Sequence, residues 1–114
     1  MDKMPTVYIP HGGGPCFFME WDPPETWNSL EAYLRRLPDD IGQKPQSILM
    51  ISAHWEGEDF QIQGQPAPEL LFDYYGFPDH TYELTYPAAG SPTLAARVSG
   101  LMAGAGHTVE TVMD

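Results

Sequence analysis

Cysteine and basic residues are scarce in this sequence of 114 residues, and long hydrophobic runs are absent. The single cysteine, Cys16, excludes an internal disulfide. Five Lys and Arg against sixteen Asp and Glu give a net charge of −11, which opposes binding to nucleic acid and to anionic lipid. The longest aliphatic run, Ile48 to Ile51, is too short to span a membrane, and residues 1–5 show no signal peptide. We therefore expect a soluble cytoplasmic protein whose partners include neither nucleic acid nor a membrane.

The composition is otherwise that of a folded protein. Apolar residues make up 42% of the sequence, with three Trp, six Tyr and five Phe, while 12 Pro and 11 Gly predict much loop. A chain of this length has room for one modest core. We expect residues 1–114 to form a single domain.

Two strand-like segments each end at a histidine. Residues 48–51 are a continuous apolar run, typical of a strand buried on both faces, and lead to His54. Residues 6–10 are a second predicted strand and lead directly into His11 and three glycines. Ligands bind at the carboxyl ends of strands in open α/β sheets. If the two strands are parallel neighbours, His11 and His54 emerge at one sheet edge as a candidate metal site.

The spacing of these histidines is weak support for metal binding. They are far apart in sequence and show no local pattern of the HExxH kind. An equally good interpretation is that each imidazole caps a strand end. His80 and His107 are interpreted as solvent-facing loop residues without a functional role.

Two helices are predicted from capping residues and apolar spacing. The first begins at Asp22 and the second at Ser91, each followed by proline, and these helices end at Pro38 and Gly104. Residues 60–63 and 107–112 are predicted strands. The fold class is therefore α/β, with a mostly parallel or mixed central sheet flanked by helices. The pattern stops where another crossover is expected, which suggests an incomplete, N-terminal portion of a larger domain.

The glycines after His11 leave a hydrolase interpretation open. The run His11 to Gly14 matches the oxyanion loop of lipase-like hydrolases, but no serine lies in the required Gly-x-Ser-x-Gly elbow. Cys16 follows Pro15 in this loop and is interpreted as a buried structural thiol.

Taken together, four segments resemble one family. These are residues 5–15, the Ser-Ala-His-Trp of 52–55, the Asp-Tyr-Tyr-Gly-Phe-Pro of 73–78 and the Tyr-Pro-Ala-Ala-Gly of 86–90. In this order they are similar to motifs of the DODA-type extradiol aromatic ring-opening dioxygenases. These enzymes belong to the class III, protocatechuate 4,5-dioxygenase β-subunit-like superfamily.

This resemblance implies a metal site and a reaction. The family's two metal-binding histidines fall on His11 and His54, with Fe(II) in functioning dioxygenases and Zn(II) in some relatives. The third ligand and an acid–base histidine are expected beyond residue 114, because the family's domain is about twice this length. Many relatives have serine in the first loop, where this chain has Gly13 and Gly14.

The implied function is extradiol cleavage of a catechol, such as a DOPA-like or protocatechuate-like diol, with O₂. Trp55, Tyr75 and Phe77 are candidate walls of the substrate pocket, although they suit a core equally well. The alternative is a catalytically inactive metal-binding or interaction domain of the same superfamily. An exposed sheet edge left by an incomplete domain would favour self-association.

Overall fold

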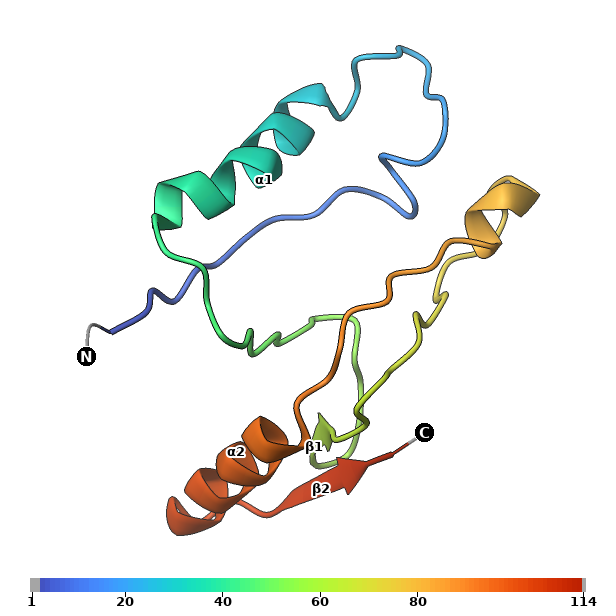
Figure 1. The fold of residues 1–114 in the computed structure, drawn as a ribbon. Coiled ribbons are helices and arrows are strands. Elements are labelled where there is room, and N and C mark those ends of the chain that lie inside the picture. The colour runs from blue at the N-terminus through green and yellow to red at the C-terminus, as the bar shows by residue number, and fades with distance from the viewer. Residues whose placement is uncertain (1–2, 114) are drawn as a thin grey trace. The chain divides into compact units, whose positions relative to one another are not determined.

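Two α-helices, a 3₁₀ helix and two short strands make up the regular structure of residues 3–113, the part of the chain that the computed structural model describes (Figure 1). In chain order these elements are α1 (Asn28–Ile41), β1 (Phe60–Gln63), η1 (Asp79–Tyr82), α2 (Pro92–Gly104) and β2 (Val109–Val112). The chain divides into two units. Unit 1 contains residues 3–46 and 71–84, and unit 2 contains residues 47–70 and 85–113. The assignment of residues 1–114 to one domain stays a prediction.

Unit 2 confirms the α/β fold class. Strands β1 and β2 pair in parallel, with Phe60 opposite Val109 and Gln63 opposite Val112, and α2 packs on both strands (Figure 1). The second helix has the predicted bounds: the Ser91 hydroxyl accepts a hydrogen bond from the Leu94 amide at 3.1 Å, and Pro92 is the first helical residue. β1 has the predicted residues, and β2 begins two residues later than expected.

Helix α1 differs from the prediction at both ends. It begins at Asn28, because a residue that precedes proline is biased away from helical backbone and both Asp22 and Pro23 precede one. The prediction that Pro38 ends this helix was wrong, since the helix continues to Ile41. An ion pair between Arg36 and Asp40 at 3.2 Å spans the proline.

The two strands predicted before the histidines are absent from the described structure. Residues 6–10 and 48–51 are irregular, and the described sheet contains β1 and β2 alone. Ile48 and Ile51 are 72% and 87% exposed. A strand needs a neighbour for its backbone hydrogen bonds, and an apolar run is buried only where another surface covers it. The apolar run identified side chains that are suited to burial, but it did not identify a second surface that would cover them.

Unit 1 has an aromatic cluster in place of a sheet. Tyr74 is central to it, with ring centroids 5.2 Å from Phe77 and 5.0 Å from Tyr82. Thr81 beside it is fully buried, and its backbone oxygen accepts a hydrogen bond from the Tyr74 hydroxyl at 2.5 Å. We use the name aromatic cluster for six residues: Trp21, Trp27, Phe72, Tyr74, Phe77 and Tyr82.

Candidate functional site

His11 is exposed and lies at the start of the glycine loop, which we define as residues 11–14. Its Nδ1 atom is 2.9 Å from the backbone oxygen of Gly12. A carbonyl oxygen only accepts, so in the neutral ring the proton of this hydrogen bond sits on Nδ1 and the lone pair is on Nε2. Histidines that bind metals commonly have their second nitrogen fixed in this way. The local geometry therefore gives His11 the tautomer of an Nε2 ligand.

The glycine loop has little space around two of its glycines. A Cβ atom built on Gly12 would lie 2.7 Å from Sγ of Cys16 and 3.1 Å from Cε3 of Trp27. Gly14 has a φ of +50°, a conformation that favours glycine, and its Cβ would lie 2.5 Å from two carbons of the Phe77 ring. Larger residues at these two positions would displace the loop or its neighbours.

Cys16 is a buried thiol beneath the glycine loop. Its backbone oxygen accepts a hydrogen bond from the Trp21 indole at 2.7 Å. Burial raises the pKa of the Cys16 thiol above its ordinary value of 9.0. A thiol that stays protonated at neutral pH is a poor nucleophile, which agrees with the predicted structural role.

His54 lies on an exposed turn in unit 2. The turn closes with a hydrogen bond from the Trp55 amide to the Ser52 backbone oxygen at 3.4 Å, and the Ser52 hydroxyl accepts one from the His54 amide at 3.1 Å. The turn is also tied to the sheet. The Trp55 indole donates to Oε1 of Gln61 on β1 at 2.9 Å, and Nε2 of Gln61 donates to Glu110 on β2 at 3.2 Å.

The predicted pocket residues lie in different settings. Trp55 is 47% exposed and Tyr75 is 91% exposed, so each presents an aromatic face at the surface of its unit. Phe77 is half-buried against the glycine loop and the aromatic cluster. His11, Tyr75 and Phe77 belong to unit 1, whereas His54 and Trp55 belong to unit 2.

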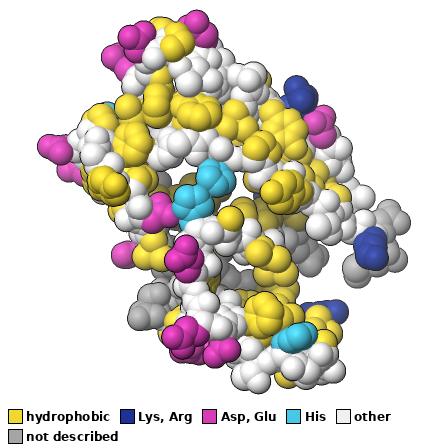
Figure 2. All heavy atoms as spheres, turned by 180° about the vertical axis from the view of Figure 1, so that it is seen from behind, with side chains coloured by type: hydrophobic (Ala, Val, Ile, Leu, Met, Phe, Trp, Pro, Cys, Tyr) yellow, Lys and Arg dark blue, Asp and Glu magenta, His cyan; other side chains and the backbone are white. Residues whose placement is uncertain are grey.

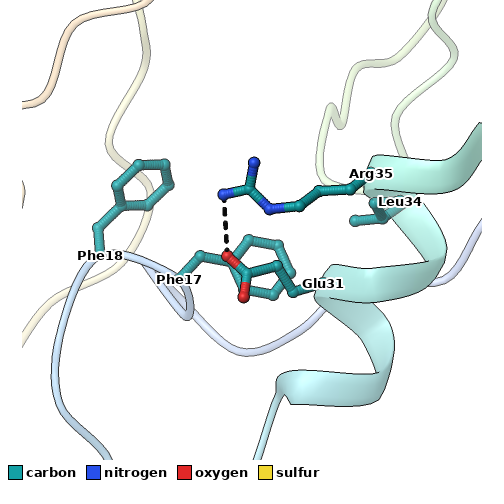
Figure 3. Close-up of a pocket in the computed structure, with 5 residues that line it drawn as sticks. All are labelled: Phe17, Phe18, Glu31, Leu34 and Arg35. Atoms are coloured by element: carbon teal, nitrogen blue, oxygen red, sulfur yellow. Dashed lines mark hydrogen bonds and ion pairs between the residues drawn. The ribbon is translucent and has the colours of Figure 1, made fainter. Parts of the chain in front are cut away.

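One described pocket lies between residues 17–18 and helix α1. It has a volume of about 230 Å³ and is lined by Phe17, Phe18, Leu34 and an ion pair in which Arg35 contacts Glu31 at 3.1 Å (Figure 3). Its lining includes neither of the predicted metal ligands and none of the predicted pocket residues. Three of the lining side chains are apolar, and the other two form the ion pair. The Arg35 side chain is 78% exposed.

A metal site needs several ligands that converge on one point. No set of three or more His, Cys, Asp or Glu side chains within residues 3–113 could hold a metal ion. Acidic side chains are spread over the face shown in Figure 2, among many apolar ones, and basic side chains are few there. His11 lies on an exposed loop of unit 1 and His54 on an exposed loop of unit 2.

Comparison with known proteins finds dioxygenases among the relatives of this chain. Dioxygenase tasH from Hapsidospora irregularis is 36% identical over 104 residues, which are 87% of this chain. The 4,5-DOPA dioxygenase extradiol proteins of Beta vulgaris and Escherichia coli are 34% and 32% identical over 101 residues, 89% of this chain. By sequence, the chain is similar over most of its length to proteins named as extradiol dioxygenases.

The match covers a minor part of these homologues. The chain spans 32% of dioxygenase tasH and 36% of the Beta vulgaris extradiol dioxygenase, about a third of their lengths. No family model matches the sequence. No helix among residues 3–113 is long and apolar enough to cross a membrane.

Sequence reasoning missed several residues that shape these loops. Gln61 holds Trp55 across six positions, and His80, interpreted as solvent-facing, places its Nε2 2.8 Å from the backbone oxygen of Phe18. The second contact joins residues 62 positions apart, and no local pattern marks it. The role of Ser52 was predictable from the sequence, because a serine hydroxyl commonly accepts a hydrogen bond from the backbone amide two residues later.

Proposed function

We propose that this chain forms part of a non-haem, metal-dependent extradiol dioxygenase that cleaves the ring of a catechol. The substrate class is a diol of the DOPA or protocatechuate kind. The ring bond next to the diol is broken, and both atoms of O₂ end in the product, a muconate-semialdehyde type of compound. The similarity to three proteins named 4,5-DOPA dioxygenase extradiol, over 89–92% of this chain, carries the proposal.

Two histidines are proposed as the metal ligands, with Fe(II) or Zn(II) as the metal. The hydrogen bond from Nδ1 of His11 to Gly12 supports Nε2 as the donor atom. The Ser52 cap fixes the backbone from which the His54 imidazole projects. Neutral imidazoles suit both metals, and two histidines plus one further ligand leave positions for substrate and O₂. Bound Fe(II) would supply a common binding point for diol and O₂.

The described residues do not complete this centre, and we assign them no step of the oxygen chemistry. The third ligand and the acid–base histidine are proposed to come from the two thirds of the homologues' length that this chain does not span. Trp55 and Tyr75 have exposed rings that could stack on a catechol, whereas Phe77 packs against backbone.

The alternative function is a metal-binding or interaction domain that lacks the reaction. Oxygen consumption separates the two functions, because a dioxygenase takes up one O₂ for each catechol cleaved. We expect uptake with a catechol and Fe(II) only when all ligands are supplied. Metal binding without uptake, in a protein that contains the remaining third ligand, would favour the alternative.

The first experiment is anaerobic Fe(II) titration of the chain by calorimetry, beside His11→Ala and His54→Ala. We expect both substitutions to weaken Fe(II) binding by at least tenfold, because each removes one donor. His80→Ala is the matched control, since this imidazole bonds to the Phe18 backbone and is not a proposed ligand. Equal affinity in the parent and both variants would contradict the proposed ligands.

A further inference from the structure

The three glycines after His11 lie against aromatic rings on separate segments of unit 1. A Cβ on Gly12 would approach Cε3 of Trp27 to 3.1 Å, and one on Gly13 would approach Cζ2 of the same indole at 3.7 Å. Gly14 lies against the edge of Phe77, where a Cβ would be 2.5 Å from Cε2 and Cζ. Gly12 and Gly14 therefore let the backbone approach its neighbours more closely than a residue with a Cβ would allow, whereas a Cβ on Gly13 would make an ordinary contact.

These rings are themselves held in place. Trp21 makes an edge contact with Trp27 at 5.6 Å between centroids and a tilted contact with Phe77 at 6.3 Å. Tyr74 packs edge-on against Phe77 at 5.2 Å, and its hydroxyl is hydrogen-bonded to Thr81. Such ring pairs contribute stability beyond the area they bury. The loop thus rests on rings that pack against one another.

We propose that Trp27 and Phe77 are positioning residues that hold the glycine loop and so orient the His11 imidazole. The imidazole is bonded to Gly12 through Nδ1, so the direction of its Nε2 atom follows the path of the Gly12–Gly14 backbone. A glycine-rich loop is otherwise the most flexible kind of backbone. Metal binding by a histidine on such a loop would cost the conformational entropy that the loop loses when it becomes ordered. The inference rests on the proposed function in so far as His11 binds a metal, but the order of the loop is a property of the chain without metal.

Phe77→Leu tests the inference, with Phe72→Leu as its matched control. Both phenylalanines belong to the aromatic cluster, but the ring of Phe72 contacts Tyr74 and Tyr82, and no loop glycine is set against it. We expect amide hydrogen exchange at Gly12–Gly14 to become at least tenfold faster in Phe77→Leu and to change less than twofold in Phe72→Leu. Fe(II) affinity should fall in parallel, by about 10–100-fold, in the Phe77 variant alone.

A purely structural role for Phe77 predicts a different result. Both variants would then lose similar stability, measured by urea unfolding, with equal exchange rates at the loop amides. That outcome would overturn the inference. If the parent chain binds no Fe(II), the proposed ligand role fails, whereas the exchange rates still decide whether Phe77 orders the loop.

The pair Gly14→Ala and Gly14→Ala with Phe77→Ala keeps the test decisive if Phe77→Leu folds poorly. An added Cβ meets the ring in the first variant but has space in the second, although the φ of +50° is unfavourable in both. We expect Gly14→Ala to destabilise the chain more in the presence of Phe77 than in its absence. Equal effects in both backgrounds would show that the ring does not support the loop.

Discussion

His11 and His54 have exposed imidazoles, whereas the thiol beside the first of them is buried. His11 and His54 stand on exposed loops; the His11 imidazole is hydrogen-bonded to the Gly12 backbone oxygen, and the His54 amide donates to the Ser52 hydroxyl. The support beneath the first loop includes the thiol of Cys16, which fits against Gly12.

The state of Cys16 leads to a prediction about pH. Burial raises the pKa of its thiol above 9.0, so the protonated form stabilises the folded chain. This contribution is complete below about pH 9 and is lost as the pH rises through the folded-state pKa. We expect iodoacetamide to alkylate Cys16 far more slowly in the folded chain than in urea at pH 8, with the folded rate rising steeply only at higher pH. Equal rates in the two conditions would contradict the burial of this thiol.

At the scale of elements, the helix ends depend on backbone geometry. Helix α1 ends at Gly42, whose φ of +80° and hydrogen bond to Pro38 at 3.2 Å make a left-handed cap. Helix α2 begins with a serine cap and proline, as its sequence predicted. α1 buries no residue fully, and Leu30, Leu34 and Leu37 are among its half-buried residues.

Two glycines with empty surroundings should respond to alanine in opposite ways. A Cβ at Gly42 or at Gly100 meets nothing within 4 Å, so the two alanine variants should differ only through the backbone conformation at each position. Gly42→Ala should destabilise the chain by about 1 kcal/mol, because alanine disfavours a positive φ. Gly100→Ala, inside α2, should stabilise it by up to about 1 kcal/mol. Urea unfolding measures both, and the same sign for the two variants would contradict these helix assignments.

At the scale of the whole molecule, apolar surface is abundant. Residues 48–51 have side chains that are 53–87% exposed, and apolar groups cover much of the face in Figure 2. Contiguous apolar surface favours association, although the net charge of −11 opposes it through repulsion. The balance should therefore depend on salt.

We expect the chain to self-associate with increasing concentration, and more strongly at high salt, in sedimentation velocity experiments. Ile51→Lys should reduce the association, because Ile51 is 87% exposed within the apolar run. Leu101→Lys is the control: it changes the charge equally at another exposed apolar site, on α2, and should have a smaller effect. A monomer at all concentrations and salt levels would show that this surface does not drive association.

The sequence by itself determined the local features of this protein. Ser91 and Pro92 predicted the start of α2, residues 60–63 were predicted as the strand β1, and four motif segments predicted the similarity to extradiol dioxygenases. Caps, turns and motifs are set by neighbours along the chain, so a single sequence contains them.

Only the tertiary structure decided which apolar segments are covered and what supports the candidate ligands. The runs at 6–10 and 48–51 have the composition of buried strands but lack strand partners in the described chain. The packing of Phe77 on Gly14 joins residues 63 apart in sequence, and no periodicity predicts it. Burial and strand pairing each require two segments in contact, and the sequence of one segment does not specify which other segment will contact it.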